Sequence, residues 1–242
     1  MTITVKDLSY DYGPQPVLDN LSLVIQPGFN VLLGPNGAGK STLFSLLTGL
    51  YQTLQGEVGY GQLSLQQHRR KVLSQLGIVF QQSTLDIDLT VKQNLIYHAC
   101  LHGLSFSTAL KNIEHILDAL QLSSRLNDKV RTLNGGHRRR LEIARAMMHK
   151  PNYLLLDEPT VGLDNESRSL IVGYIRQQCK QQRLCVLWTT HLMDEVERSD
   201  FLIILSKGQV KAEGSTEQLC REFQADDVYQ LYRQLTESVE IV

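Results

Sequence analysis

The sequence is poor in the features that mark several large classes of protein. Its four cysteines are scattered and form no C-x-x-C pair, so we expect reduced thiols rather than a disulfide framework or a cysteine zinc site. No apolar run approaches the roughly 20 residues that cross a bilayer, and the opening residues MTITVKDLSY lack the pattern of a signal peptide. We therefore expect a soluble protein of the cytoplasm with no membrane span of its own.

An excess of charge of either sign is also lacking. The 242 residues contain 24 Lys and Arg against 25 Asp and Glu, which gives a formal net charge of -1. Because a general binder of nucleic acid usually presents a strongly basic surface, we expect no nucleic-acid partner. Repeats and Gly/Ser-rich linkers are absent as well, so residues 1–242 are predicted to form one domain around a core drawn from a 42% hydrophobic content.

Short apolar runs alternate with helical patterns along the chain. Residues 1–10 alternate apolar and polar residues, which predicts a half-buried strand, and a second strand is expected at 18–25. Buried strands are predicted for the runs FNVLLG, LGIVFQQ, YLLLDE, LCVLWTT and FLIILSKG. Residues 90–150 are mostly helical in pattern. Buried strands that alternate with helices predict an α/β fold with a mostly parallel sheet.

The stretch GPNGAGKST, residues 34–42, matches the phosphate-loop pattern G-x-x-x-x-G-K-[ST]. Glycines allow backbone N–H groups to surround phosphate oxygens, Lys40 brings a positive charge to the β and γ phosphates, and the Ser41 hydroxyl can ligate Mg²⁺. The predicted strand before the loop and the helix after it favour this interpretation over a plain Gly-rich turn. The expected nucleotide contacts are Gly34, Pro35, Asn36, Gly37, Ala38, Gly39, Lys40, Ser41 and Thr42.

A pair of carboxylates, Asp157 and Glu158, follows the apolar run in YLLLDEP. In doubly wound α/β proteins ligands bind at the carboxyl ends of the strands, which is where this pair is expected. Asp157 would then hold Mg²⁺, and Glu158 would accept a proton from a water that attacks the γ phosphate. The alternative is a strand end that turns into a solvated acidic loop, and the phosphate loop upstream favours the first interpretation.

With these motifs the chain resembles one family closely, the ATP-binding-cassette (ABC) ATPases, over essentially its whole length. Tyr12 matches the aromatic residue that stacks on adenine, with Tyr10 as the weaker candidate. GIVFQQ matches the glutamine loop, in which Gln81 is expected to contact Mg²⁺ and the attacking water. VLWTTHLMDEVE matches the switch-histidine region, with His191 near the γ phosphate, and VGLD supplies Asp164, which would couple the two sites of a dimer.

This resemblance implies a fold and its division into parts. The fold is a P-loop NTPase core with a mostly parallel sheet, an antiparallel β subdomain and an inserted α-helical subdomain. The core is expected at about 1–88 and 151–220, and the helical subdomain at about 89–150. A C-terminal helical tail is expected at about 218–242.

The resemblance also implies that ATP hydrolysis needs two chains. Two cassettes, identical or different, pair head to tail, and the signature helix of one chain points at the γ phosphate of the ATP bound by the other. The residues expected to act in catalysis are Glu158, His191 and Lys40. The residues expected to ligate Mg²⁺ are Ser41, Gln81 and Asp157.

The signature departs from the family pattern LSGGQ. Here it reads LNGGH, and its residues are Leu133, Asn134, Gly135, Gly136 and His137. Asparagine still offers an amide donor for a γ-phosphate oxygen and is a strong N-cap residue, so a working signature is expected. A degenerate, slow site is the competing interpretation. The arginines at 138–140 are interpreted either as a solvated helix face or as a basic group near the phosphate.

The predicted function is that of the ATPase subunit of a membrane transporter. The cassette would dock on a separate polytopic permease at the inner face of the cell membrane, through the groove between the Gln81 loop and the helical subdomain. The motifs are similar to those of bacterial export-type cassettes, and LNGGHRRR is similar to a subgroup associated with quinoprotein (PQQ) alcohol oxidation. The alternative is a soluble ABC mechanoenzyme acting on ribosomes or DNA, which the near-neutral charge disfavours. An unrelated P-loop kinase or GTPase would lack the signature and switch-histidine motifs.

Overall fold

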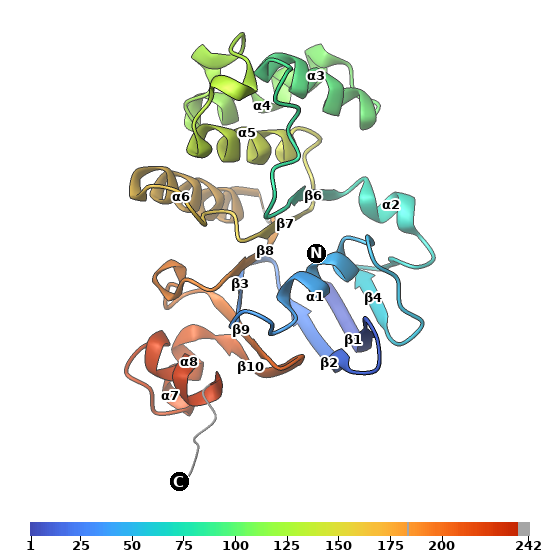
Figure 1. Ribbon diagram of the computed structural model, residues 1–242, viewed down its shortest axis with the longest axis vertical. Helices are drawn as coiled ribbons and strands as arrows, with labels where there is room; N and C mark the ends of the chain where they lie inside the picture. The colour runs from blue at the N-terminus through green and yellow to red at the C-terminus, as the bar shows by residue number, and fades with distance from the viewer. Residues whose placement is uncertain (183, 237–242) are drawn as a thin grey trace. The chain divides into compact units, whose positions relative to one another are not determined.

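The structure, a computed structural model, describes residues 1–182 and 184–236 of the chain (Figure 1). The chain folds into two compact units. The first contains Met1–Leu73 and the chain from Cys185 onward, and the second contains Ser74–Leu184. None of the helices in the described part combines the length and the apolar character that a membrane span requires.

The first unit begins with an antiparallel sheet. Its strands are β1 (Ile3–Asp11), β2 (Pro16–Ile25), β4 (Glu57–Tyr60) and β5 (Leu63–Ser64), in the order β2-β1-β4-β5. Neighbouring strands pair in antiparallel fashion throughout. In β1 the side chains of Ile3, Val5 and Leu8 are buried while Lys6 is exposed, as expected for a half-buried strand. The predicted antiparallel β subdomain is therefore confirmed.

A second sheet in the first unit leads into the phosphate loop. The strands that this unit contributes to the sheet are, in spatial order, β10 (Gln209–Ser215), β9 (Phe201–Ser206), β3 (Gly28–Leu33) and β8 (Cys185–Thr190). Strand β3 runs parallel to both β8 and β9, while β10 is antiparallel to β9. Helix α1 (Lys40–Leu47) follows β3, so the expected strand, loop and helix are confirmed. The unit also contains α2 (Arg69–Leu73) and the 3₁₀ turn η3 (Met193–Glu195).

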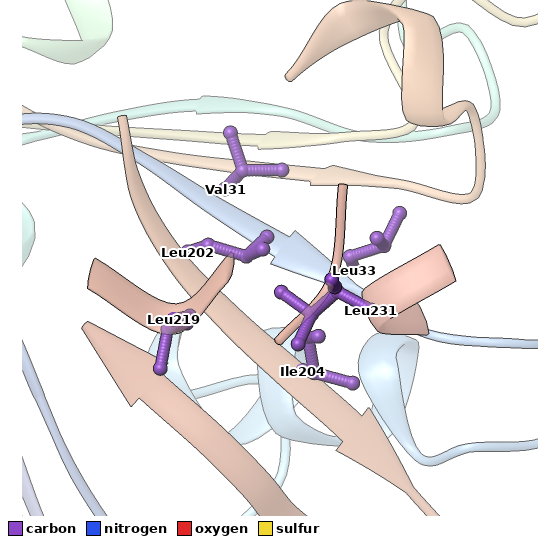
Figure 2. Close-up of a cluster of buried hydrophobic side chains, with 7 residues drawn as sticks. Val31, Leu33, Leu202, Ile204, Leu219 and Leu231 are labelled. Atoms are coloured by element: carbon purple, nitrogen blue, oxygen red, sulfur yellow. The ribbon is translucent and has the colours of Figure 1, made fainter. Parts of the chain in front are cut away.

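Two helices close the core of this sheet, α7 (Thr216–Glu222) and α8 (Val228–Thr236). Figure 2 shows Leu219 and Leu231 from these helices in one apolar cluster with Leu33, Leu202 and Ile204 of the sheet. Their burial anchors α7 and α8 on the strands that flank the phosphate loop. Of the tail expected at about 218–242, residues 237–242 lie outside the described residues.

The second unit combines two parallel strands with the helical segment. The strands β6 (Leu76–Val79) and β7 (Tyr153–Asp157) pair in parallel. The helical elements are α3 (Val91–Leu101), α4 (Phe106–Ala119), η1 (Ser123–Arg125), η2 (Val130–Thr132), α5 (Gly135–Met147) and α6 (Asn165–Gln182). Helix α5 contacts α3, α4, α6 and β6. The unit is larger than the helical subdomain expected at about 89–150, because β6, β7 and α6 belong to it as well.

The start of the helical segment follows from local chemistry. Thr90 caps α3, since its hydroxyl accepts a hydrogen bond from the backbone N–H of Gln93 at 3.1 Å. The Gln93 side chain accepts from the backbone N–H of Thr90 at 2.8 Å in return, which completes a capping box. The sequence TVKQ therefore fixes where α3 begins.

Candidate functional site

The loop between β3 and α1 has the geometry of an anion cradle. Gly39, the residue before α1, has a φ of 103°, a left-handed conformation that favours glycine, and its helix has no side-chain cap. A Cβ at Gly34 would lie 2.4 Å from the carbonyl oxygen of Leu205, so the loop passes β9 without room for a side chain. Because glycine at the N-cap has no side chain that could accept from the first N–H groups of α1, an anion can take that place.

Lys40 lies inside this loop rather than on its surface. Its ammonium group donates hydrogen bonds to the carbonyl oxygens of Gly34 at 2.6 Å and Pro35 at 3.2 Å, and the residue is only 6% exposed. The ammonium places a positive charge within the loop, and this charge favours a negatively charged ligand there. The structure thus places the Lys40 ammonium against two carbonyl oxygens of the loop that the sequence pattern predicts to bind phosphate.

Three tyrosines form an aromatic cluster in the same unit. Tyr12, which is 62% exposed, has its ring centroid 5.2 Å from that of Tyr10 and 5.9 Å from that of Tyr51. The rings of Tyr10 and Tyr51 are stacked at 5.5 Å. The Tyr12 hydroxyl lies 3.2 Å from the hydroxyl of Thr42, so the residue predicted to contact adenine lies beside the phosphate loop. Tyr51 was not predicted, because no local motif marks it as a neighbour of Tyr12.

His191 directly follows the last residue of β8 and is half-buried. Its neighbour on the chain, Leu192, donates its backbone N–H to the Thr190 hydroxyl at 3.0 Å, which fixes the turn after the strand. The first unit therefore holds the phosphate loop, the tyrosine cluster and the switch-histidine position.

In the second unit, the acidic pair ends a fully buried strand. All five residues of β7 are buried, and the pair Asp157 and Glu158 remains buried at the strand end. Glu158 has a φ of 44°, a conformation that costs free energy for a residue with a Cβ and that recurs at functional sites. Its carboxylate accepts a hydrogen bond from the Gln81 side-chain amide at 3.2 Å. The structure therefore brings together two residues that were predicted from motifs far apart in the sequence.

The signature forms the start of helix α5. Asn134 is the N-cap, and its Oδ1 accepts a hydrogen bond from the backbone N–H of His137 at 2.8 Å. Nδ1 of His137 lies 2.6 Å from the same Oδ1, which it can bond in the Nδ1–H tautomer. Burial, followed by the charge of Arg140, lowers the pKa of His137. Within the described part of the chain, the Nδ2 group of the exposed Asn134 has no hydrogen-bond partner, so a donor is left facing outward.

Gly136 of the signature allows α5 to approach α6 closely. A Cβ at Gly136 would lie 2.3 Å from the Ser167 hydroxyl oxygen, so a side chain is excluded there. Ser167 in turn donates its backbone N–H to Oδ1 of Asp164 at 2.7 Å, and this bond lowers the pKa of Asp164. The structure thus joins the signature and the VGLD loop, two further motifs that the sequence predicted separately.

The arginines that follow the signature are not a solvated face, and that interpretation is wrong for two of them. Arg139 and Arg140 are buried. Arg140 donates to the carbonyl oxygen of Leu120 at 3.2 Å and to the side-chain oxygen of Gln121 at 3.0 Å. Arg138 donates to backbone carbonyl oxygens at Val130 and Arg131. A run of arginines is predicted from the sequence to be exposed, because the carbonyl groups that accept their hydrogen bonds lie elsewhere in the sequence.

Comparisons with known proteins agree with these features. The family described as "ABC transporter" matches residues 18–161, which is more than half of the chain. The linearmycin resistance ATP-binding protein LnrL of Bacillus subtilis is 34% identical over 231 residues, covering 95% of this chain and 74% of that protein. The Nod factor export ATP-binding protein I of Cupriavidus metallidurans is 37% identical over 224 residues, covering 91% of this chain and 73% of that protein.

Solved structures give the same result. An ATP-binding subunit of an ABC transporter superposes with a TM-score of 0.88 at 28% identity, and the match covers 97% of this chain and 99% of that chain. The dimeric post-hydrolysis state of an ATP-binding cassette bound to ADP and Pi superposes with a TM-score of 0.78 at 26% identity, covering 88% of this chain and 98% of that chain. The chain therefore belongs to the ABC transporter family and is an ATP-binding subunit that hydrolyses ATP.

Proposed function

We propose that this chain drives export across a membrane by hydrolysing ATP at the interface between two cassettes. The observation that carries the two-cassette arrangement is the N-terminus of α5, where Asn134 uses Oδ1 as the helix cap and leaves Nδ2 as an outward donor. A helix N-terminus with a spare donor suits an anion. A γ phosphate bound by the phosphate loop of a second chain supplies that anion.

The phosphate-binding residues act mainly through charge. Lys40 and the first amides of α1 neutralise the β and γ phosphates, and the exposed Tyr12 ring offers a face on which adenine stacks. Asn36 and the other predicted loop contacts, apart from Pro35, which has no backbone N–H, supply backbone amides around the same oxygens. Binding of this kind leaves little covalent chemistry for the protein to perform, because phosphoryl transfer depends on positioning and electrostatics.

The donor set also fits a magnesium ion. Ser41 offers a hydroxyl oxygen, Gln81 an amide oxygen and Asp157 a carboxylate, and Mg²⁺ prefers such hard oxygen ligands together with substrate phosphates. When bound, Mg²⁺ supplies positive charge against the phosphate oxygens. This fit supports ATP with Mg²⁺ as the form in which the nucleotide binds.

The hydrolytic step is assigned to Glu158. Its carboxylate accepts the proton of the attacking water. Gln81, whose side-chain amide is hydrogen-bonded to that carboxylate, contacts the same water. His191 holds the γ phosphate in line with the water. Asp164, tied through Ser167 to the close approach at Gly136, couples the two sites of the dimer.

A permease partner and export are proposed on separate grounds. Two of the relatives are named for linearmycin resistance and Nod factor export. In the second unit, Ile87, Tyr97 and Leu101 are exposed large hydrophobic side chains at 52%, 63% and 66%. Tyr97 and Leu101 lie four residues apart on α3 and so share one face of the helix. We assign the apolar face of α3, together with the exposed Ile87, to a polytopic permease that holds the chain at the inner face of the membrane.

The assignment to the quinoprotein alcohol oxidation subgroup rests on the string LNGGHRRR alone and stays a prediction.

Affinity purification of the tagged chain from its own membranes tests the proposal. We expect a polytopic membrane protein to co-purify, and the pair Tyr97→Asp and Leu101→Asp to abolish its recovery while ATP binding is kept. A double substitution at the exposed Tyr229 and Leu54, far along the sequence and in the first unit, is the matched control. Recovery of ribosomes or DNA in place of a membrane protein would reject the transport role.

A further inference from the structure

Side chains of helix α5 that follow the signature in sequence form hydrogen bonds with the backbone of the glutamine loop. One terminal guanidinium nitrogen of Arg139 donates a hydrogen bond to the carbonyl oxygen of Phe80 at 2.6 Å. The other terminal nitrogen donates to the carbonyl oxygen of Gln81 at 2.7 Å. The first nitrogen also donates to a carboxylate oxygen of Glu142 at 2.8 Å. A planar guanidinium with donors in a fixed fork matches two adjacent carbonyls better than any other side chain.

Hydrogen bonds from α5 also reach Thr84, three residues further along the loop. The second carboxylate oxygen of Glu142 accepts the backbone N–H of Thr84 at 2.9 Å. Arg145, about two turns after Arg139 on α5, donates to the carbonyl oxygen of Thr84 at 3.0 Å and also to its hydroxyl. Both ends of the segment 80–84 are therefore bound to the same helix face.

These bonds are better explained by positioning than by stability. The side chains of Arg139 and Glu142 are 10% and 3% exposed, and a buried ion pair contributes little net stability because both charges lose their hydration. What such a pair does provide is one fixed geometry. Here that geometry holds the backbone of Gln81, whose side chain in turn donates to Glu158 at 3.2 Å.

We propose that Arg139 is a positioning residue for ATP hydrolysis, which acts by fixing the Gln81 backbone so that the Gln81 side chain meets Glu158. Through this contact one helix serves both sites of the dimer: its N-terminus receives the ATP of the partner, and its next turn holds the glutamine loop of its own chain. The inference rests on the proposed roles of Gln81 and Glu158.

The substitution Arg139→Lys tests it in the full chain, together with the permease when the two co-purify. Lysine keeps a positive charge beside Glu142 but lacks the two-pronged fork. We expect kcat for ATP to fall by roughly ten- to a hundredfold, as for a displaced catalytic group, with KM unchanged within about twofold because the phosphate loop is untouched. The matched control is Arg125→Lys, whose exposed guanidinium pairs with Asp128, and it should leave both constants unchanged.

A double-substitution cycle separates positioning from general damage. If Arg139 acts through Gln81, then Arg139→Lys should lower kcat in the native background and cause no further loss in a Gln81→Ala background. Should Arg139→Lys fail to fold, the paired change Arg139→Met with Glu142→Gln removes both buried charges and enters the same cycle.

Each outcome has one meaning. A native kcat in Arg139→Lys overturns the inference, and so do losses that multiply fully in the Gln81→Ala background, while in both cases the roles of Gln81 and Glu158 stand. A native kcat in Gln81→Ala alone instead rejects the proposed role of Gln81, and the inference falls with it.

Discussion

Asn134 is predicted to be both the cap of α5 and the donor to a partner's γ phosphate, and three substitutions separate these roles. Asn134→Ala removes both. Asn134→Ser restores the residue usual in the family signature, with one hydroxyl that can accept and donate. Asn134→Asp keeps the oxygen that accepts from His137 but replaces the Nδ2 donor with a negatively charged oxygen.

The magnitudes follow from the hydrogen bond at the helix start. Its 2.8 Å length to the His137 N–H is that of a well-formed cap. Loss of such a cap costs about 1 kcal/mol of unfolding free energy, which in a domain of this size lowers Tm by about 2–4 °C. Loss of one donor aimed at transition-state charge lowers kcat by about a hundredfold or more. Since Asp and Asn cap helices about equally well, Asn134→Asp should lose activity without losing stability.

The assay combines phosphate release at saturating ATP and Mg²⁺ with thermal unfolding of the same samples. We expect Asn134→Ala to lose both activity and a few degrees of Tm (about 2–4 °C), and Asn134→Ser to keep both. Asn134→Asp should keep its Tm and lose its turnover. Native turnover in Asn134→Asp would show that Asn134 is a cap and nothing more, and the head-to-tail arrangement would lose its main support.

Four further predictions follow from single contacts. Lys40→Ala should weaken ATP binding by at least tenfold in a direct titration, because the buried ammonium is the charge of the phosphate loop; unchanged affinity would reject the loop assignment. Glu158→Gln should bind ATP normally while turnover falls by about 10² or more, and normal turnover would remove Glu158 as the base. Gly136→Ala should lower the unfolding free energy by about 1–3 kcal/mol in urea titration, since its Cβ would lie 2.3 Å from the Ser167 hydroxyl oxygen; a native midpoint would show that α6 can shift freely. Burial lowers the pKa of His149 from 6.5 to about 4. Between these values the unfolded chain binds more protons than the native one, so the free energy of unfolding should fall as the pH drops through this window. A His149→Gln variant should lose less stability between pH 7 and pH 4.5, and an equal loss would show that His149 is not the group responsible.

The parts of the site that the sequence predicts are those whose chemistry is local. The phosphate loop needs glycines beside a lysine and a strand that leads into a helix, and β3, the loop and α1 have this form. The acidic pair needs only a buried strand that ends in carboxylates, and β7 ends at Asp157. In both cases the residues that bind are consecutive, so their order on the chain already determines their geometry.

The parts that sequence reasoning missed depend on contacts between distant residues. Arg139 and Phe80 are 59 positions apart, and nothing in the run RRR marks one guanidinium as the ligand of two carbonyls in another loop. Tyr51 meets Tyr12 only because the first unit folds β1 close to the end of α1. A charged residue that is buried next to the signature indicates a structural partner elsewhere in the chain. The sequence cannot give this indication, because it does not show which face of the helix is buried.

The departure at the signature can be understood from the same helix. A serine there must use one oxygen both to accept the third amide of the helix and to donate to phosphate. In this chain the two tasks belong to different atoms. Oδ1 of Asn134 accepts hydrogen bonds from the backbone N–H and the ring Nδ1–H of His137, while Nδ2 remains available as a donor. The histidine supplies a second hydrogen bond to Oδ1 and so holds the amide plane in one orientation. His137 therefore supports the orientation that the Asn134 amide needs, and exchanging His137 for glutamine should cost more activity in the native chain than in the Asn134→Ser background, where no amide plane has to be held.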